Sequence, residues 1–243
     1  MSDGKSVFMG HESPIQQRLQ ITFGKFDALR YTSTLDLAKV WERVLRRAGL
    51  PLLYTEGFNT RPRIQLATAL PLGISSECEI LDVSLREILP TLDGLIQRLE
   101  AVSPPGLKVY RIDDVPVMSP PLQTLVKSAE YIITFGDPIS REDLQAAIDQ
   151  TLSQERIIKV IEGKRRRSLL DLRPLIYDLQ VDEAGRLWAH LSTGERGNMR
   201  IEDLLEHMNL GEMFYRAHRT RLHLDDYAHH TAVRDRLKKK KDE

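Results

Sequence analysis

Apolar and polar positions follow a regular order along the first half of the chain. Leu19, Ile21 and Phe23 alternate with polar residues, as in a strand with one buried face. The sequence Ser33-Thr34-Leu35-Asp36 then predicts a helix start, and apolar residues continue at helical spacing as far as Ala48. Further strands are predicted at 64–68, 81–85 and 107–113, and a second helix at 92–102. The resulting order, βαββαβ, is that of the ferredoxin-like fold, an antiparallel sheet with both helices on one face.

The second half repeats this order of elements with little residue identity. The predicted elements are a strand at 131–135, a helix at 140–152, a strand at 156–162, a hairpin of 175–181 and 187–191, a short helix at 201–208 and a strand at 215–224. We therefore expect an α/β (α+β) protein of tandem ferredoxin-like βαββαβ halves with antiparallel sheets. The expected segments are a flexible N-terminus (1–16), the first half (17–115), a proline-rich linker (116–128), the second half (129–224) and a basic disordered tail (225–243).

Composition excludes several kinds of chemistry. Cys78 is the only cysteine among 243 residues, so an internal disulfide is impossible. A cysteine-ligated iron–sulfur cluster or a structural zinc site needs several closely spaced ligands, so we expect no metal site in this chain. No stretch approaches the about 18 apolar residues of a membrane helix, and residues 1–16 lack the apolar centre of a signal peptide. A cytoplasmic protein without a membrane segment is expected.

A loop after the first helix combines an aromatic ring with cations. It contains Glu56, Gly57, Phe58 and Asn59, and Arg61 and Arg63 follow. A ring beside guanidinium groups can stack on a base or another flat ligand while the cations neutralise phosphate. The alternative is a tight connection in which Phe58 packs inward.

Clustered cations are the other candidates for ligand binding. Lys plus Arg and Asp plus Glu both number 35, so a nucleic-acid surface has to be a local patch. Arg43, Arg46 and Arg47 share the polar face of the first helix and, with Arg30, are predicted to form one basic surface. A second cluster consists of Lys164, Arg165, Arg166 and Arg167. The alternative for both clusters is a solvated surface that contacts no ligand.

Other titratable residues carry weaker indications of function. Glu77, Glu79 and Asp82 surround Cys78, and paired carboxylates can shift each other's pKa for acid–base chemistry, but acids on a strand edge are a common structural feature. Four histidines, His190, His207, His218 and His223, are too loosely spaced for a known metal motif and are interpreted as surface or sheet-face residues.

Several blocks of the chain resemble a known family. They include Leu29 to Leu37, Trp41-Glu42-Arg43, Arg46 to Pro51, Tyr54 to Asn59, Pro62-Arg63-Ile64, Leu70-Pro71-Leu72-Gly73, Asp171-Leu172-Arg173-Pro174 and Arg219-Thr220. Together they are similar to the radical-SAM-linked family of unknown function, most strongly over 17–112. Its members stand alone or follow a radical S-adenosylmethionine protein with a cobalamin-binding-type domain. The resemblance implies a radical SAM partner, which would hold the iron–sulfur cluster and S-adenosylmethionine, and it implies no catalytic residue and no cofactor in this chain.

Three functional hypotheses follow. The first is a non-catalytic recognition subunit that docks a radical SAM enzyme and presents RNA or another anionic substrate to it. The second is a metal-independent RNA-processing enzyme, by analogy with tandem ferredoxin-like proteins of that kind. The third is a structural scaffold.

Overall fold

The computed structural model describes residues 15–162, 167–194 and 197–225. Its first half contains β1 (Gln17–Lys25), the 3-10 helix η1 (Asp27–Tyr31), α1 (Thr34–Arg47), β2 (Ile64–Leu66), β3 (Ser75–Leu85), α2 (Leu95–Glu100) and β4 (Leu107–Val115). The strands are ordered β4-β1-β3-β2, and each neighbouring pair is antiparallel. This is the predicted ferredoxin-like arrangement.

The second half has the same strand order. It contains β5 (Val126–Phe135), α4 (Arg141–Leu152), β8 (Ile176–Val181), β9 (Leu187–Ser192), α5 (Ile201–His207) and β10 (Tyr215–Leu224). Its sheet runs β10-β5-β9-β8, again antiparallel throughout. The tandem ferredoxin-like prediction is therefore confirmed.

A small hairpin is inserted into the second half. β6 (Ile158–Glu162) and β7 (Arg167–Asp171) form a separate two-stranded sheet, and the 3-10 helix η2 (Arg173–Leu175) connects it to β8. The strand predicted at 156–162 therefore belongs to this insertion. The alternation there did not reflect a buried face, since Ile158 and Val160 are each about half exposed.

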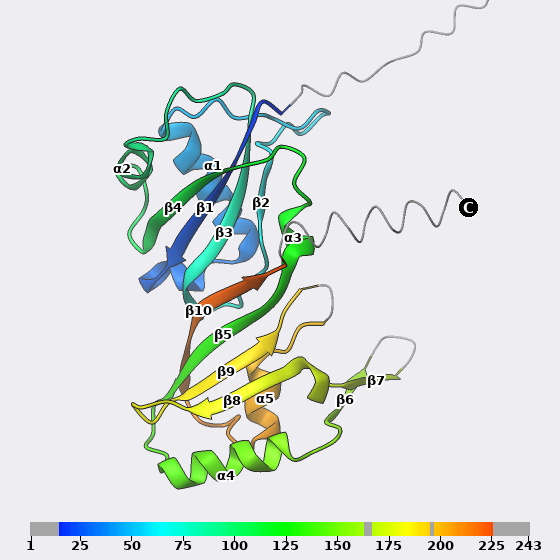
Figure 1. Cartoon of the computed structure of the whole chain (residues 1–243). Coiled ribbons are helices and arrows are strands. Elements are labelled where there is room, and N and C mark those ends of the chain that lie inside the picture. The colour runs from blue at the N-terminus through cyan, green and yellow to red at the C-terminus, as the bar shows by residue number, and fades with distance from the viewer. Residues whose placement is uncertain (1–14, 163–166, 195–196, 226–243) are drawn as a thin grey trace, which may run out of the picture.

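The two halves share one sheet, as Figure 1 shows. The start of β3 pairs in parallel with β10, with His218 opposite Ser75 and Arg219 opposite Ser76. The segment predicted as a linker, 116–128, contains the short helix α3 (Leu122–Leu125) and the first residues of β5. Leu122 is fully buried there. The second half thus begins at Val126 and joins the first half through backbone hydrogen bonds as well as through the chain.

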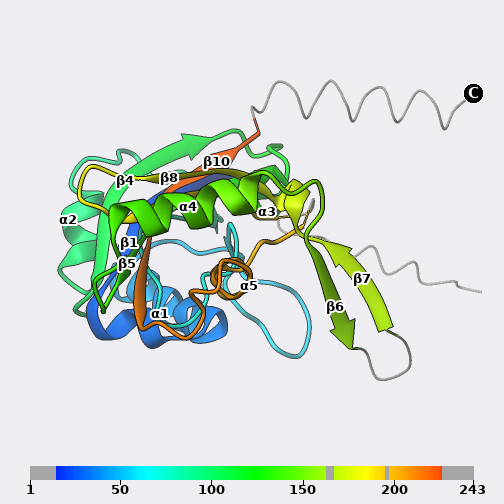
Figure 2. The same ribbon diagram turned by 90° about the horizontal axis from the view of Figure 1, so that it is seen from below.

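Each half has a hydrophobic core beneath its helices. In the first, Leu19, Ile21 and Phe23 are fully buried, and Trp41 of α1 packs edge-on against Phe23 with ring centroids 4.9 Å apart. The second core contains Ile133, Leu144, Ile148, Leu187, Leu191, Leu204 and Leu205. In Figure 2, α1 and α5 lie on the same side of the sheet. The opposite side, here called the open face, carries the polar residues that alternate with the core.

Capping residues set the starts of the longer helices, as predicted. The Ser33 hydroxyl accepts a hydrogen bond from the Asp36 backbone N–H at 3.1 Å, and Ser140 accepts one from Asp143 at 3.0 Å. No helix within the described ranges is long and apolar enough to cross a membrane.

Candidate functional site

The loop of residues 54–62 projects from the first half and is held by hydrogen bonds between its own residues. The Thr55 N–H donates to the Arg61 carbonyl at 2.8 Å, and the Arg61 N–H donates to the Thr55 hydroxyl at 3.1 Å. Gly57, with φ of 111°, lies in the region that favours glycine and allows the chain to turn. Phe58 follows at the tip and is fully exposed. The inward packing considered for Phe58 is therefore wrong.

A cavity of about 410 Å³ lies beside this loop. Its lining includes Arg18, Thr55, Arg63, Gln65, Asp82 and Ser119. Arg18 alternates with the core residue Leu19, and Asp82 lies between the core residues Leu81 and Val83, so the cavity opens on the open face. The segment that follows β4 forms its other wall.

A buried ion pair forms the base of the cavity. The Arg18 guanidinium contacts Asp82 Oδ2 through Nη2 and also through Nε at 3.2 Å, and both side chains are less than 10% exposed. Arg18 also donates to the carbonyls of Ser119 and Pro120, at 2.5 and 2.9 Å. These bonds fix the wall of the cavity to its base.

One carboxylate oxygen of this pair is not used. Asp82 Oδ1 is buried, and no described residue meets it at hydrogen-bonding geometry. Burial raises the pKa of Asp82, an effect that hydrogen bonding to Arg18 and to Gln20, which lies opposite it on β1, and the charge of Arg18 only partly offset. The base of the cavity therefore offers an acceptor for an N–H or O–H group of a ligand, beside a cation.

The predicted cations are distributed over separate surfaces. Arg43, Arg46 and Arg47 are exposed on α1, which covers the face opposite the cavity. Arg46 pairs with its neighbour Glu42 at 3.7 Å. Arg30 lies in the 3-10 helix η1, which precedes α1. Arg43, Arg46 and Arg47 therefore lie together on α1, and Arg30 belongs to a different element.

Arg30 lies in a different hollow. This hollow measures about 250 Å³, and Tyr31, Leu72 and Phe214 are among its lining residues. The Arg30 guanidinium lies 4.8 Å from the centre of the Tyr31 ring, while its Nε is buried without a described partner. The Arg30 guanidinium therefore makes a cation–π contact with the Tyr31 ring.

The cluster at 164–167 is described in part. Lys164, Arg165 and Arg166 lie outside the described residues. Arg167 begins β7, is exposed, and pairs with Glu162 across the hairpin at 2.9 Å. Of the predicted site, the structure brings Glu56, Phe58, Asn59 and Arg61 together on the loop, with Arg63 in the adjacent cavity.

The carboxylates near Cys78 do not form a catalytic pair. Glu79 is buried, and both of its oxygens accept from Arg219 Nη1, at 2.9 and 3.2 Å. Burial raises the pKa of Cys78 to about 12, so its thiol remains protonated at neutral pH. Glu77 is exposed and lies 3.8 Å from His218.

A group of rings on the open face of the second half was not predicted from the sequence. His190 on β9 and His223 on β10 have ring centroids 4.7 Å apart, although 33 positions separate them in the chain. Their spacing follows no motif, and only the pairing of β5 with both β9 and β10 brings them together. Among the described residues, no group of three or more side chains could hold a metal ion.

Comparisons with known proteins identify the family to which the chain belongs. A family model described as an uncharacterized protein conserved in bacteria (DUF2344) matches residues 18–201. The chain belongs to this bacterial family. A search of curated proteins finds no match.

Solved structures show only distant likenesses. A chain in the crystal structure of a Cbf5-Nop10-Gar1 complex matches 87% of this chain at 12% identity and a TM-score of 0.47, and this chain spans 50% of its length. A putative glycine cleavage system transcriptional repressor also matches at 12% identity, with 83% and 95% of the two chains covered and a TM-score of 0.27. An unknown protein from Galdieria sulphuraria has 12% identity, coverage of 86% and 99%, and a TM-score of 0.24. These likenesses carry no inference about function.

Proposed function

We propose that this protein is a non-catalytic recognition subunit that binds single-stranded RNA and presents it to a radical SAM enzyme. Phe58 is the observation that supports RNA binding. Phe58 is fully exposed at the tip of a loop that is held by hydrogen bonds, so both faces of its ring are open to a flat ligand. Every base offers a flat face to such a ring, so stacking on it is tolerant of sequence.

Two arginines near Phe58 supply positive charge. Arg61 on the same loop is exposed and Arg63 lines the cavity, and neither forms an ion pair with a described residue. Free guanidinium groups beside a ring fit a ligand that combines bases with phosphates. The cavity adds the unpaired Asp82 oxygen, which suits an amino or hydroxyl group of a nucleotide.

Binding of fluorescent single-stranded RNA pools at several salt concentrations tests this proposal. We expect Phe58→Ala to weaken binding by about 1–3 kcal/mol with little change in salt dependence, because stacking releases no counterions. Phe58→Tyr should retain binding. Arg61→Gln and Arg63→Gln should each reduce the salt slope by about one unit.

Leu35→Ala is the matched control, since Leu35 is also strongly exposed but lies on α1. It should bind as wild type does. If wild type shows no salt-dependent binding at low ionic strength, the RNA part of the proposal fails. Cleavage of the RNA in the absence of metal would instead favour the RNA-processing alternative.

The radical SAM partner is proposed from the sequence resemblance. Affinity purification of the tagged full chain from its own cells under anaerobic conditions should recover a protein with the absorbance of an iron–sulfur cluster. Loss of the complex in every salt condition, with RNA binding intact, would contradict the partner part of the proposal and leave the RNA part standing.

A further inference from the structure

Four rings meet on the open face of the second half, around His190. Trp188 and His190 alternate along β9 with the fully buried Leu187, Ala189 and Leu191, so both side chains point away from the core. Tyr177 on β8 contacts His190 edge-on, with ring centroids 5.1 Å apart. Trp188 lies 6.1 Å from His190, and His223 lies 4.7 Å from it on the other side. We call Tyr177, Trp188, His190 and His223 the ring cluster.

Hydrogen bonds hold the two imidazoles in place. His190 Nε2 lies 2.8 Å from the Ser128 hydroxyl, and His223 Nε2 lies 2.7 Å from Glu130 Oε1. Both partners are on β5, the strand that lies between β9 and β10. The rings are therefore positioned before any ligand arrives, which reduces the entropy lost on binding.

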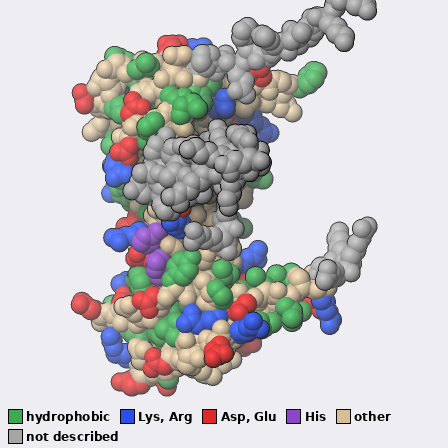
Figure 3. Space-filling view, turned by 45° about the vertical axis from the view of Figure 1, so that its right-hand side comes forward, with side chains coloured by type: hydrophobic (Ala, Val, Ile, Leu, Met, Phe, Trp, Pro, Cys, Tyr) green, Lys and Arg blue, Asp and Glu red, His purple; other side chains and the backbone are tan. Residues whose placement is uncertain are grey.

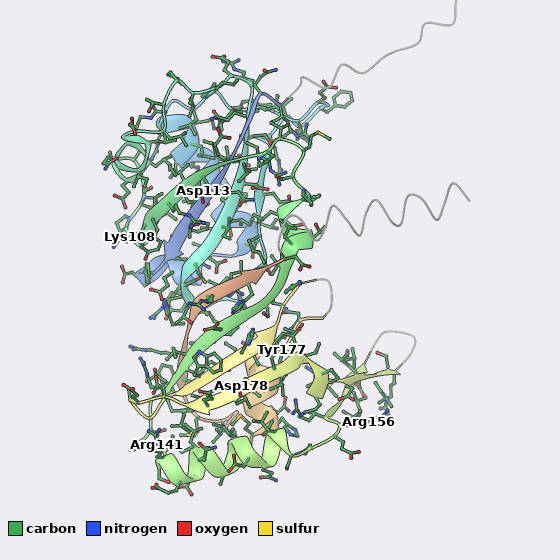
Figure 4. All side chains as sticks on the ribbon, in the orientation of Figure 1. Lys108, Asp113, Arg141, Arg156, Tyr177 and Asp178 are labelled. Atoms are coloured by element: carbon green, nitrogen blue, oxygen red, sulfur yellow. The ribbon has the colours of Figure 1, made fainter. Side chains whose placement is uncertain are left out.

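The ring cluster remains accessible. Tyr177 is 43% exposed and the His223 side chain 34%, while Trp188 and His190 are half-buried. Figure 4 shows Tyr177 on β8, with α5 behind the sheet, and Figure 3 shows histidine side chains at the surface beside basic ones. No described segment covers these rings as α4 and α5 cover the opposite face.

We propose that the ring cluster is a stacking platform for the bases of single-stranded RNA, a second binding surface on the same sheet. The choice of RNA as the ligand rests on the proposed function, but the residues of the ring cluster differ from those of the loop and the cavity. His190 and Trp188 lie on a central strand of a four-stranded ferredoxin-like sheet, and aromatic side chains at such positions bind bases in other RNA-binding modules. The platform and the cavity both open on the open face.

Charge around the platform fits this occupant. Arg216 and Arg221 are exposed on β10, opposite Thr134 and Glu130 of β5. Arg221 lies 3.8 Å from Glu130, and Arg216 forms no ion pair with a described residue. Burial and the nearby His223 lower the pKa of His190, so its ring is neutral at pH 7 and available for stacking. The carboxylates of Glu130 and Asp178, which lie near His190, offset part of this charge, and Arg216 remains available to a phosphate beside the neutral rings.

Tryptophan fluorescence gives a readout specific to the platform. The chain has two tryptophans, Trp41 and Trp188, and Trp41 is fully buried under the first half. Titration of the full chain with a single-stranded oligouridine should therefore quench the emission of Trp188. Trp188→Phe should abolish the quench and retain most of the affinity, because phenylalanine also stacks.

Two variants measure the contribution of the neighbouring rings. Tyr177→Ala and His190→Ala should each weaken binding about 5- to 150-fold without changing the salt slope. Tyr177→Phe should bind as wild type does. Thr134→Ala, a change on the same face of β5 away from the rings, is the control. Circular dichroism and the urea midpoint of each variant confirm that it is folded.

The outcomes separate this inference from the proposed function. RNA binding that depends on Phe58 but shows no quench, with Tyr177→Ala and His190→Ala at wild-type affinity, would overturn the platform and leave the proposed function intact. Absence of RNA binding by wild type would remove both. A quench that persists at saturation in Phe58→Ala would show that the two surfaces bind separately.

Discussion

Two buried arginine–carboxylate pairs in this protein have the same chemistry and different surroundings. Arg219 of β10 bonds Glu79 of β3 across the junction of the halves, and its remaining N–H groups donate to the Tyr131 hydroxyl at 2.9 and 3.1 Å and to the Ala69 carbonyl at 3.2 Å. Arg18 bonds Asp82 in the first half, but there one oxygen is unpaired and a cavity lies alongside. A pair with every group satisfied serves the fold, whereas a pair left incomplete beside a cavity has an acceptor to offer a ligand.

The junction pair also has charged and polar neighbours enclosed with it. Lys25 is almost fully buried, and its amine donates to the Thr32 carbonyl at 2.9 Å. Burial lowers the pKa of Lys25 and raises that of Tyr131, while Glu79 raises that of Arg219. Such groups are costly to bury unless each has a partner, so the network is sensitive to the loss of any member.

The largest effect on stability is expected from Arg219→Met. This change leaves the Glu79 carboxylate buried without its cation, which costs about 3–5 kcal/mol. Urea unfolding should show the loss as a lower midpoint. Arg216→Met, on the same strand but exposed, is the control and should lie within about 0.5 kcal/mol of wild type. A loss under about 1 kcal/mol for Arg219→Met would mean that the junction does not depend on this pair.

The sequence predicted the fold within each half but not the junction between them. Alternation in β1 and helical spacing in α1 reflect local burial, so element order could be read directly. The pairing of β3 with β10 joins residues about 140 positions apart, and no local pattern records it. The strand expected at 156–162 is β6 of the inserted hairpin, because alternating residues look the same whether or not one face is covered. The second strand of that hairpin, β7, was not predicted.

The candidate site was predictable only where its residues are neighbours in the chain. Phe58, Arg61 and Arg63 belong to one loop and the strand next to it, and composition was enough to single them out. The cavity depends on Arg18 and Asp82, which are 64 positions apart and are brought together by the register of β1 and β3. The ring cluster likewise depends on strand order, and the spacing of its histidines along the chain matches no known motif.

A smaller effect is expected from Asp82→Asn. The amide keeps the volume of the side chain but loses the charge that pairs with Arg18, and a hydrogen bond to a charged group contributes about 1.5–3 kcal/mol. The free energy of unfolding should fall by the lower part of that range, because water in the cavity can solvate Arg18. Asp113→Asn, which breaks the exposed pair with Arg111, is the control and should cost under about 1 kcal/mol. If Asp82→Asn costs as much as Arg219→Met, the two pairs serve the same structural role.

The smallest effect is expected from the titration of His190. Burial and the charge of His223 lower its pKa below the ordinary 6.5, while Glu130 and Asp178 act in the opposite direction. The folded state then binds fewer protons here than the unfolded state does, so stability rises with pH through this window and is lost as pH falls below about 6.5. The half-buried position of the ring keeps the effect small.

His190→Gln isolates this contribution, because glutamine can still bond the Ser128 hydroxyl but does not titrate. Urea midpoints of wild type and variant should be compared at pH 7.5, 6.5 and 5.5. The urea midpoint of wild type relative to that of His190→Gln should fall as the pH falls. Both proteins contain the same carboxylates, so the effect of their protonation on stability cancels in this difference. If the urea midpoints of the two proteins change in parallel with pH, His190 has the same protonation in the folded and unfolded states. The ring cluster would then be more open to water than its burial implies.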